Sequence, residues 1–250
     1  MNNDVLDITP GAIAAAIGEY CRRHNCSWQP RAALIDMDGT LIDSMRSHAA
    51  AWKRMTDREG LSVPQDEFYL YEGMTGRATI QMLWKRDKGY VPTDEEADEL
   101  YAVKGGYFNE MPKVPVMPGA AQMLRTLMAE GITRVLVTGS KQLSSLNRLD
   151  DDFPGAFPHN LRVTATDVAH GKPSPEPYLK AMEMASVKPE QSIVIENAPL
   201  GVESGARSGA FVIAVTTGPI PASAMTAAGA HLVFPTMPSL AAAIQCIIKN

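Results

Sequence analysis

Two aspartates follow a short apolar run near the start of this 250-residue chain. The run AALI spans residues 32–35, and Asp36, Met37, Asp38 and Gly39 come directly after it. Alternate side chains of extended backbone point the same way, so Asp36 and Asp38 should face one site. Two close carboxylates repel each other, and a divalent cation would offset that repulsion. A carboxylate can also attack phosphorus, while a second carboxyl exchanges protons with the leaving group and with water.

A calcium-binding loop is the main alternative explanation of the D-x-D-G pattern. An EF-hand loop that began at Asp36 would need glycine at its sixth position and an acid at its twelfth. Those positions hold Leu41 and Ser47, and a strand-like run rather than a helix precedes the motif. The pattern therefore favours a phosphoryl-transfer site over a calcium loop.

Further apolar runs place other polar residues at predicted strand ends. Four of them are separated mostly by helical stretches: RVLVT at 134–138, LRVTA at 161–165, SIVIE at 192–196 and FVIAV at 211–215. Short buried strands that alternate with helices predict an α/β fold with a parallel sheet. Ligands bind at the carboxyl ends of the strands in such sheets, so Thr138 and Glu196 should lie near Asp36.

A long segment separates the first predicted strand from the second. Residues 44–114 are polar and helix-rich, with helical stretches at 48–60, 77–89 and 93–108. Ordinary connections after a strand are far shorter, which predicts an inserted α-helical cap over 44–114. The proline-rich run PKVPVMPG at 112–119 would be the return hinge.

The remaining residues divide into a core and an N-terminal extension. The predicted core comprises residues 30–43 and 115–250, and residues 1–29 form the extension. A short amphipathic helix is expected at 9–21, where Thr9 can cap it and Pro10 suits its first turn. We expect this helix to dock on the core.

Composition sets the broad class of protein. Hydrophobic residues make up 45% and charged residues 20%, the formal net charge is −5 and the pI is about 5.6. This balance is typical of a globular protein and argues against nucleic acid or an anionic membrane as the main partner. No apolar run reaches the ~18 residues of a membrane span, and no basic region suggests a signal peptide.

Cysteine use points to a reducing compartment. The three cysteines, Cys21, Cys26 and Cys246, form neither a CxxC pair nor a zinc-type cluster with histidine. Unpaired thiols of this kind are ordinary in the cytoplasm. We therefore expect a cytoplasmic protein. We also expect a monomer that acts on a small phosphorylated substrate, with neither nucleic acid nor membrane as partner.

The first motif, AALIDMDGTLID, resembles that of the haloacid dehalogenase-like superfamily of aspartyl phosphatases and phosphomutases. The resemblance implies a Rossmann-like parallel-sheet core. It also implies that Asp36 is the nucleophile and Asp38 the general acid/base. Dehalogenases lack the second aspartate, so Asp38 indicates phosphoryl transfer rather than dehalogenation.

Three further motifs of the family follow in order. VTGS at 137–140 resembles the second motif, in which the Thr138 hydroxyl holds the phosphoryl group and Gly139 and Ser140 open an anion-binding helix. GKPSPEPY at 171–178 resembles the third, with Lys172 neutralising the nucleophile and the phosphate. SIVIENAPLGVESG at 192–205 resembles the fourth.

The position of the cap, after the first motif, matches the C1-type cap of the β-phosphoglucomutase-like branch. In that branch DSMRSHAAAW at 43–52 resembles the entry to the cap, which implies a functional role for His48. The fourth motif usually reads Glu-Asp there, whereas this chain has Glu196 and Asn197. Asparagine can still offer an oxygen to Mg²⁺, and Glu72 of the cap can replace the missing carboxylate. The predicted metal ligands are Asp36, Asp38, Glu72, Glu196 and Asn197.

The loop YEGMTGRATI at 71–80 bears on the substrate. β-Phosphoglucomutases bind the non-transferring phosphate with an arginine of this loop, but Gly76 takes that place here and Arg77 follows. Together with ENAPLGV, the loop resembles a sub-branch that includes inorganic pyrophosphatase. Lys104 and Lys141 are further predicted substrate contacts, with His48, Arg77, Gly139 and Ser140.

These features predict a Mg²⁺-dependent phosphohydrolase that forms an aspartyl-phosphate and acts on a small phosphate such as inorganic pyrophosphate. One alternative is a phosphomutase that acts on β-glucose 1-phosphate and needs a bisphosphate activator. Another is a non-catalytic module that binds metal and phosphate. Replacing Asp36 would abolish turnover in an enzyme and leave a binding module intact.

Overall fold

The computed structural model describes residues 8–140 and 143–250, and its centre is a parallel sheet. Six strands are hydrogen-bonded in the order β3-β2-β1-β4-β5-β6, and every pair is parallel. Their bounds are β1 Ala32–Ile35, β2 Thr133–Val137, β3 Arg162–Val163, β4 Ser192–Glu196, β5 Phe211–Val215 and β6 Leu232–Phe234. The α/β fold with a Rossmann-like parallel sheet is therefore confirmed. The strand β6 was not predicted.

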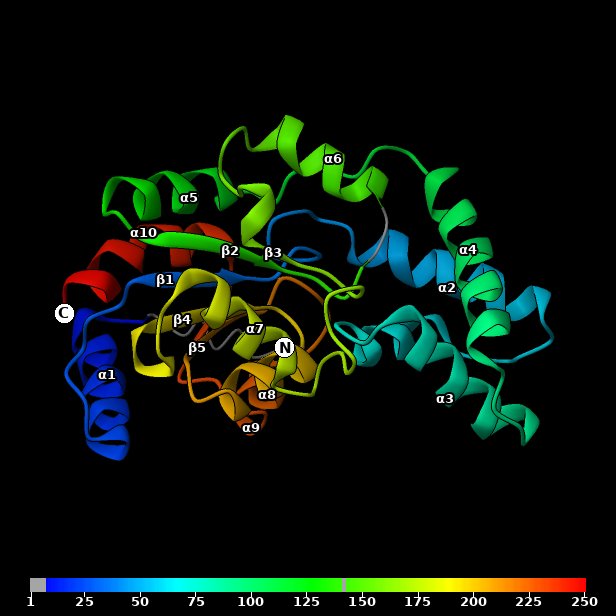
Figure 1. Cartoon of the computed structure of the whole chain (residues 1–250), viewed down its shortest axis with the longest axis horizontal. Coiled ribbons are helices and arrows are strands. Elements are labelled where there is room, and N and C mark those ends of the chain that lie inside the picture. Colours follow the sequence, from blue (N-terminus) through cyan, green and yellow to red (C-terminus); the bar gives the residue numbers. More distant parts are fainter. Residues whose placement is uncertain (1–7, 141–142) are drawn as a thin grey trace, which may run out of the picture.

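Alternation along the strands divides the apolar side chains between two cores. On β1, Ala33 and Ile35 face one side of the sheet, while Ala32 and Leu34 face the other. The first side is covered by α1 Pro10–His24, α5 Ala120–Ala129, α6 Leu143–Asp152 and α10 Met237–Lys249. The second side is covered by α7 Glu176–Ala185, α8 Pro199–Arg207 and α9 Ala222–Ala227. Figure 1 shows the sheet between α5, α6 and α10 on one side and α7, α8 and α9 on the other.

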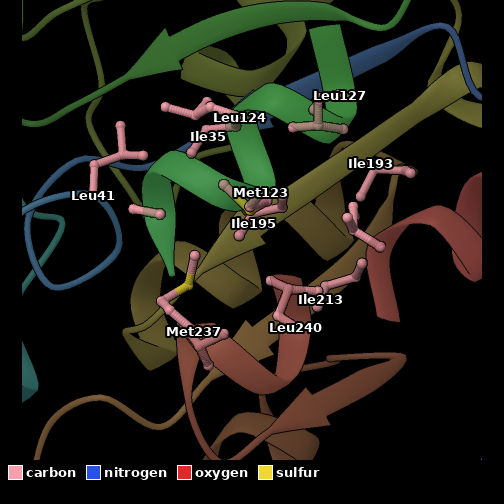
Figure 2. Close-up of a cluster of buried hydrophobic side chains, with 14 of the residues drawn as sticks. Ile35, Leu41, Met123, Leu124, Leu127, Ile193, Ile195, Ile213, Met237 and Leu240 are labelled. Carbon is pink, nitrogen blue, oxygen red and sulfur yellow. The ribbon is translucent and has the colours of Figure 1, made fainter. Parts of the chain in front are cut away.

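The first core is continuous from the sheet to the helices above it. Figure 2 shows Ile35 and Ile195, from neighbouring strands, against Met123 of α5 and Leu240 of α10. All four side chains are fully buried. Each such apolar side chain contributes about 1.5–3 kcal/mol when it leaves water, so this contact fixes the sheet beneath the site.

The cap lies between β1 and α5 in the sequence. Its elements are α2 Met45–Arg58, the 3-10 helix η1 Gln65–Tyr71, α3 Gly76–Lys88 and α4 Asp94–Asn109. Figure 1 shows α2, α3 and α4 grouped at one end of the molecule, beyond the sheet. Buried aromatic side chains hold the group together, namely Trp52, Phe68, Trp84 and Tyr101. Thr93 begins α4 with a complete capping box to Glu96.

Two chain segments connect the cap to the core, and they run side by side. The Asp43 N–H donates to the Pro115 carbonyl at 2.9 Å, and Ile42 and Val116 form an antiparallel bridge. The Met117 N–H donates to the Leu41 carbonyl, also at 2.9 Å. The cap therefore leaves and re-enters the core at nearly the same point.

The helix α1 docks on the core as predicted. Thr9 caps it by accepting from the Ala12 N–H, and Pro10 is its first residue. Buried Tyr20 packs against Phe211 and donates its hydroxyl proton to the Gly209 carbonyl at 2.7 Å. Two further 3-10 turns, His159–Leu161 and Pro189–Gln191, precede β3 and β4. Within the described ranges, no helix combines the length and the apolar character that a membrane crossing needs.

Candidate active site

The candidate site lies where the strand order reverses. The chain runs outward from β1 to β2 and β3 on one side, and from β4 to β5 and β6 on the other. Sheets of this kind bind ligands at that switch point, beyond the carboxyl ends of the strands. Asp36 follows β1, Thr138 follows β2, and Glu196 ends β4. The three residues therefore meet at one place, as the sequence predicts.

A small cavity of about 50 Å³ opens at this point, between the core and the cap. Its lining contains most of the predicted site residues, namely Asp36, Asp38, His48, Glu72, Lys104, Thr138, Gly139, Ser140, Glu196 and Asn197. Trp52, Phe68 and Tyr101 of the cap complete one wall. Lys172 lies beneath Asp36 and outside this lining.

Asp36 and Lys172 form a buried ion pair. Lys172 Nζ lies 2.7 Å from Asp36 Oδ1, and it also donates to the Val137 carbonyl at 3.2 Å. Burial raises the pKa of Asp36 to about 8, with a further rise from Glu196 and an opposing effect from Lys172. Burial alone would lower the pKa of Lys172, but Asp36 and Glu196 raise it above its ordinary value. The lysine is therefore a permanent cation beside the predicted nucleophile.

Glu196 holds Lys172 from the other side. Its carboxylate accepts from Lys172 Nζ at 2.6 Å, from the Tyr178 hydroxyl at 2.7 Å and from the Asn197 N–H at 3.0 Å. Its side chain is only 1% exposed. The sequence predicts a metal ligand at Glu196, but these contacts fit a residue that positions Lys172.

Asp38 is the end of a chain of contacts that begins in the cap. It accepts from the Ser44 hydroxyl at 2.6 Å, and His48 Nε2 lies 3.1 Å from the same oxygen. Lys104 Nζ lies 2.6 Å from His48 Nδ1, and the imidazole stacks on Phe108. An ammonium can only donate, so Nδ1 accepts and Nε2 carries the proton that it donates to Asp38.

The charge states along this chain follow from burial and from the neighbours. Burial would raise the pKa of Asp38, but His48, Ser44 and Lys104 together lower it to about 2. Burial and Lys104 lower the pKa of His48, so the ring is neutral. Burial lowers the pKa of Lys104 to about 8, against the attraction of Glu72 and Asp38. Asp38 is therefore a carboxylate at neutral pH, the form that can take a proton from water.

Glu72 projects from the loop between η1 and α3 and lines the same cavity. Burial and repulsion by Asp38 raise its pKa to about 8, although Lys104 opposes the shift. Over residues 8–140 and 143–250, no side chain or N–H donates a hydrogen bond to the Glu72 carboxylate. A carboxylate with no hydrogen-bond donor beside other acids is stabilised by a bound cation or by its own protonation.

The oxygen atoms around the cavity suit a hard cation. No three His, Cys, Asp or Glu side chains of the described chain stand close enough to hold a metal by themselves. Asn197, however, is buried beside Gly39, where any Cβ would come within 1.9 Å of Asn197 Nδ2. Its amide oxygen can complete a set with the carboxylates of Asp36 and Glu72. Carboxylate and amide oxygens are ligands that Mg²⁺ accepts, so the residues fit this ion.

Thr138 presents a buried hydroxyl to the cavity. The Ser140 N–H donates to Thr138 Oγ1 at 3.1 Å, so the turn after β2 is closed locally. Gly139 and Ser140 line the cavity beside it. The predicted substrate contact Lys141 lies outside the described residues.

Arg77 is not part of the cavity, so the structure does not bring it together with the other predicted substrate contacts. Its guanidinium binds Asp94 and Asp98 of α4, each at 2.7 Å. It lines a separate, outer depression with Thr75 and Thr166. The two aspartates lie one turn apart on the neighbouring helix, and they hold the arginine away from the acids of the site.

Some residues around the site were not predicted from the sequence, namely Ser44, Trp52, Tyr101 and Phe108, although they share helix faces with the predicted His48 and Lys104. Ser44, which caps α2, His48 and Trp52 recur at every fourth position, and Tyr101, Lys104 and Phe108 lie three and four positions apart on α4. Residues at this spacing share one face of a helix. The spacing would have identified both faces that line the site.

Comparison with known proteins agrees with this geometry. Residues 30–209 match the model of the haloacid dehalogenase-like hydrolases. Validoxylamine A 7'-phosphate phosphatase of Streptomyces hygroscopicus subsp. limoneus is 32% identical over 198 residues, which cover 75% of this chain and 86% of the relative. Hexitol phosphatase A of Escherichia coli is 30% identical over 185 residues, covering 73% and 81%.

A solved structure extends the match across nearly the whole chain. A protein of Bacteroides vulgatus, provisionally assigned as a β-phosphoglucomutase, is 41% identical and superposes with a TM-score of 0.92. The match covers 96% of this chain and 98% of that one. The chain therefore belongs to the haloacid dehalogenase-like hydrolase family.

Proposed function

We propose that the protein is a Mg²⁺-dependent phosphohydrolase that works through an aspartyl-phosphate at Asp36. Asp36 attacks phosphorus, and the P–O bond to the leaving group breaks as the new P–O bond forms. Lys172 and the Thr138 hydroxyl offset charge on the transferring group. Asp38 passes to the leaving oxygen a proton that the incoming phosphate brings. As a carboxylate, it then takes a proton from the water that hydrolyses the intermediate.

Ionisation of Asp36 depends on positive charge close by. Burial and the charge of Glu196 raise the pKa of Asp36 and so favour its protonated form, which is a poor nucleophile. A bound Mg²⁺ held by Asp36, Asn197 and Glu72 would supply charge that favours the carboxylate and screens the phosphate. The side chain of Lys172 acts in the same direction from beneath.

The size of the cavity carries the proposal for the substrate. A volume of about 50 Å³ is far below the ~300–1,000 Å³ of pockets that hold drug-sized ligands. Its walls are mostly polar and include both Glu72 and Lys104. A compact, highly charged substrate suits such a space, so inorganic pyrophosphate is the leading candidate. Arg77, turned toward Asp94 and Asp98, offers no second phosphate site in the cavity.

A sugar phosphate is the second candidate, and the relatives favour it. Two phosphatases at 30% identity or more are named for a validoxylamine phosphate and for hexitol phosphates. The contacts from Lys104 through His48 to Asp38 also suit phosphomutase chemistry. They could hold the Asp38 carboxylate in position to take a proton from a sugar hydroxyl. For a sugar-phosphate phosphatase and for a phosphomutase alike, the cap would have to move outward to admit the sugar.

A panel of substrates tests these candidates. Phosphate release would be measured with Mg²⁺ and with EDTA, on pyrophosphate, β-glucose 1-phosphate, hexose 6-phosphates and hexitol phosphates. We expect kcat/KM for pyrophosphate to exceed the others by at least about tenfold, with Asp36→Asn inactive. A preference for hexose or hexitol phosphates would reject pyrophosphate.

Two further outcomes identify the remaining alternatives. Formation of glucose 6-phosphate from β-glucose 1-phosphate, with little phosphate release, would identify a mutase. Equal activity of Asp36→Asn and the unaltered protein would reject the aspartyl-phosphate mechanism altogether. Correct folding of Asp36→Asn would be checked by its circular dichroism.

A further inference from the structure

Two glycines of the core, Gly139 and Gly171, lie close to a loop of the cap. A Cβ at Gly171 would lie 2.6 Å from Thr75 Cγ2 and 3.3 Å from the Thr75 nitrogen. A Cβ at Gly139 would lie 2.9 Å from the Gly73 carbonyl oxygen and 3.0 Å from that of Met74. Side chains at these two core positions would therefore collide with the cap loop 73–75. We call this contact the cap seam.

Backbone conformation does not explain the two core glycines. Neither Gly139 nor Gly171 has a positive φ, in contrast to Gly39 and Gly73. Alanine could adopt either backbone conformation without strain. The space that glycine leaves is occupied by the cap loop, so close approach of the cap is what these positions permit.

The cap seam separates two spaces of very different size. On its inner side lies the cavity of about 50 Å³ with Asp36 and Gly73 in its lining. On its outer side lies a depression of about 320 Å³, lined by Thr75, Arg77 and Thr166. Gly139 lines both spaces. The gap left within the seam is about 10 Å³, roughly the room of one water molecule.

We propose that the contact of Gly171 with Thr75 determines substrate size. With glycine at 171, the cap loop closes on the core and limits the active-site cavity to a compact phosphate. If the loop were held outward, the cavity would join the outer depression and admit a bulkier leaving group. This inference rests on the proposed function, because it takes phosphoryl transfer to occur at Asp36.

The test compares two substrates in four variants. The substrates are pyrophosphate and glucose 6-phosphate, each with Mg²⁺, and the variants are Gly171→Ala, Thr75→Ser, the double variant and Gly106→Ala. Serine at 75 removes the methyl that alanine would meet but keeps the hydroxyl that accepts from the Ala78 N–H. Gly106 is a matched control in the cap helix α4, where an added Cβ meets nothing within 4 Å.

We expect Gly171→Ala to raise the ratio of kcat/KM for glucose 6-phosphate to that for pyrophosphate by about tenfold or more. The double variant should return the ratio to within about threefold of the unaltered protein, because the methyl is the main obstacle. Thr75→Ser alone and Gly106→Ala should leave the ratio unchanged. A change in Lys172, the neighbour of Gly171, would instead lower both rates together.

Equal loss on both substrates, without rescue by Thr75→Ser, would overturn the inference. If Gly171→Ala did not fold, Gly139→Ala would replace it, since its Cβ also meets only the cap loop at these distances. Failure of the proposed function is a separate result. Even if the unaltered protein preferred hexose phosphates, the direction of the change in ratio would still decide whether the cap seam limits substrate size.

Discussion

The ammonium of Lys104 lies 2.6 Å from Nδ1 of His48, inside a group of aromatic side chains. Trp52, Tyr101 and Phe108 surround the ammonium, with ring centroids 5.2 to 5.6 Å away. Since Nε2 of the same imidazole reaches Asp38, the cap contacts the proposed acid/base residue through two side chains. This contact exists only while α2 and α4 stand over the core, so cap position and the state of Asp38 are linked.

Lys104→Met should lower kcat by about 10–10²-fold. Without the ammonium, Nδ1 of His48 has no donor, and the ring is no longer held in the tautomer that donates to Asp38. Steady-state kcat would be compared with that of Lys85→Met, a change at an exposed lysine of α3. An unaltered kcat in Lys104→Met would show that the chain to Asp38 has no part in turnover.

Glu196→Gln should lower kcat by about 10–10²-fold and leave the Mg²⁺ requirement within about twofold. Its carboxylate holds Lys172 at 2.6 Å, and glutamine cannot stabilise the ammonium in the same way. Titration of activity with Mg²⁺ separates the two roles. A large rise in the half-saturating Mg²⁺ concentration would show that Glu196 is a metal ligand after all.

Glu72→Ala should raise the half-saturating Mg²⁺ concentration by about tenfold or more, because it removes a carboxylate that would hold the proposed ion. Glu95→Ala, an exposed acid in the first turn of α4, is the matched control. The same Mg²⁺ titration, run on both variants, checks the difference. Identical titrations for Glu72→Ala and the unaltered protein would remove Glu72 from the metal site.

Arg77→Ala should leave kcat/KM for every substrate within about twofold and cost at most about 1 kcal/mol of stability. The guanidinium is partly exposed, and its ion pairs with Asp94 and Asp98 lie outside the cavity. Kinetics on pyrophosphate and β-glucose 1-phosphate, with urea unfolding, would measure both effects. Selective loss with the sugar phosphate would mean that Arg77 turns inward when a sugar is bound.

Stability without metal should fall as the pH rises. Glu72 has a pKa of about 8 in the folded protein against an ordinary value of 4.5, so the folded state binds its proton more tightly. The contribution of Glu72 to the free energy of unfolding is complete when the pH is below the ordinary pKa of 4.5. It is lost as the pH rises toward about 8. Glu72→Gln cannot ionise, so at about pH 8 in EDTA it should be more stable than the unaltered protein by about 1–3 kcal/mol.

Urea unfolding in EDTA at several pH values would measure this difference. The gap between Glu72→Gln and the unaltered protein should widen from about pH 5 to about pH 8. Parallel curves would show that Glu72 does not carry the shifted pKa. Added Mg²⁺ should narrow the gap at high pH, because it stabilises the ionised carboxylate.

Much of the site could be predicted because parallel strands bring their carboxyl ends together. The run at 32–35 is a strand with the predicted bounds, and Asp36 and Thr138 meet at its end. The orientation of the Glu196 side chain could not be predicted, since it depends on a hydrogen bond from Tyr178 of helix α7. Strand β6 was missed because three residues are too few to show a period.

Arg77 of the cap also shows that the direction of a side chain could not be predicted from the sequence alone. Its place in the sequence beside Gly76 suggested a ligand for the substrate, but the direction of its side chain depends on Asp94 and Asp98. These aspartates belong to the next helix, and only the packing of α3 on α4 brings them within reach. The side-chain directions of Glu196 and Arg77 thus depend on contacts between elements rather than on patterns within one element.

The paired connections at Ile42 and Val116 have a consequence for the history of the fold. Because the two ends of the cap meet, the sheet keeps its strand order and its connections whatever lies between them. An ancestral chain could acquire such a segment in one insertion, and a descendant could exchange it for another. Selection for a new substrate can then act on the cap while the catalytic strands stay as they are.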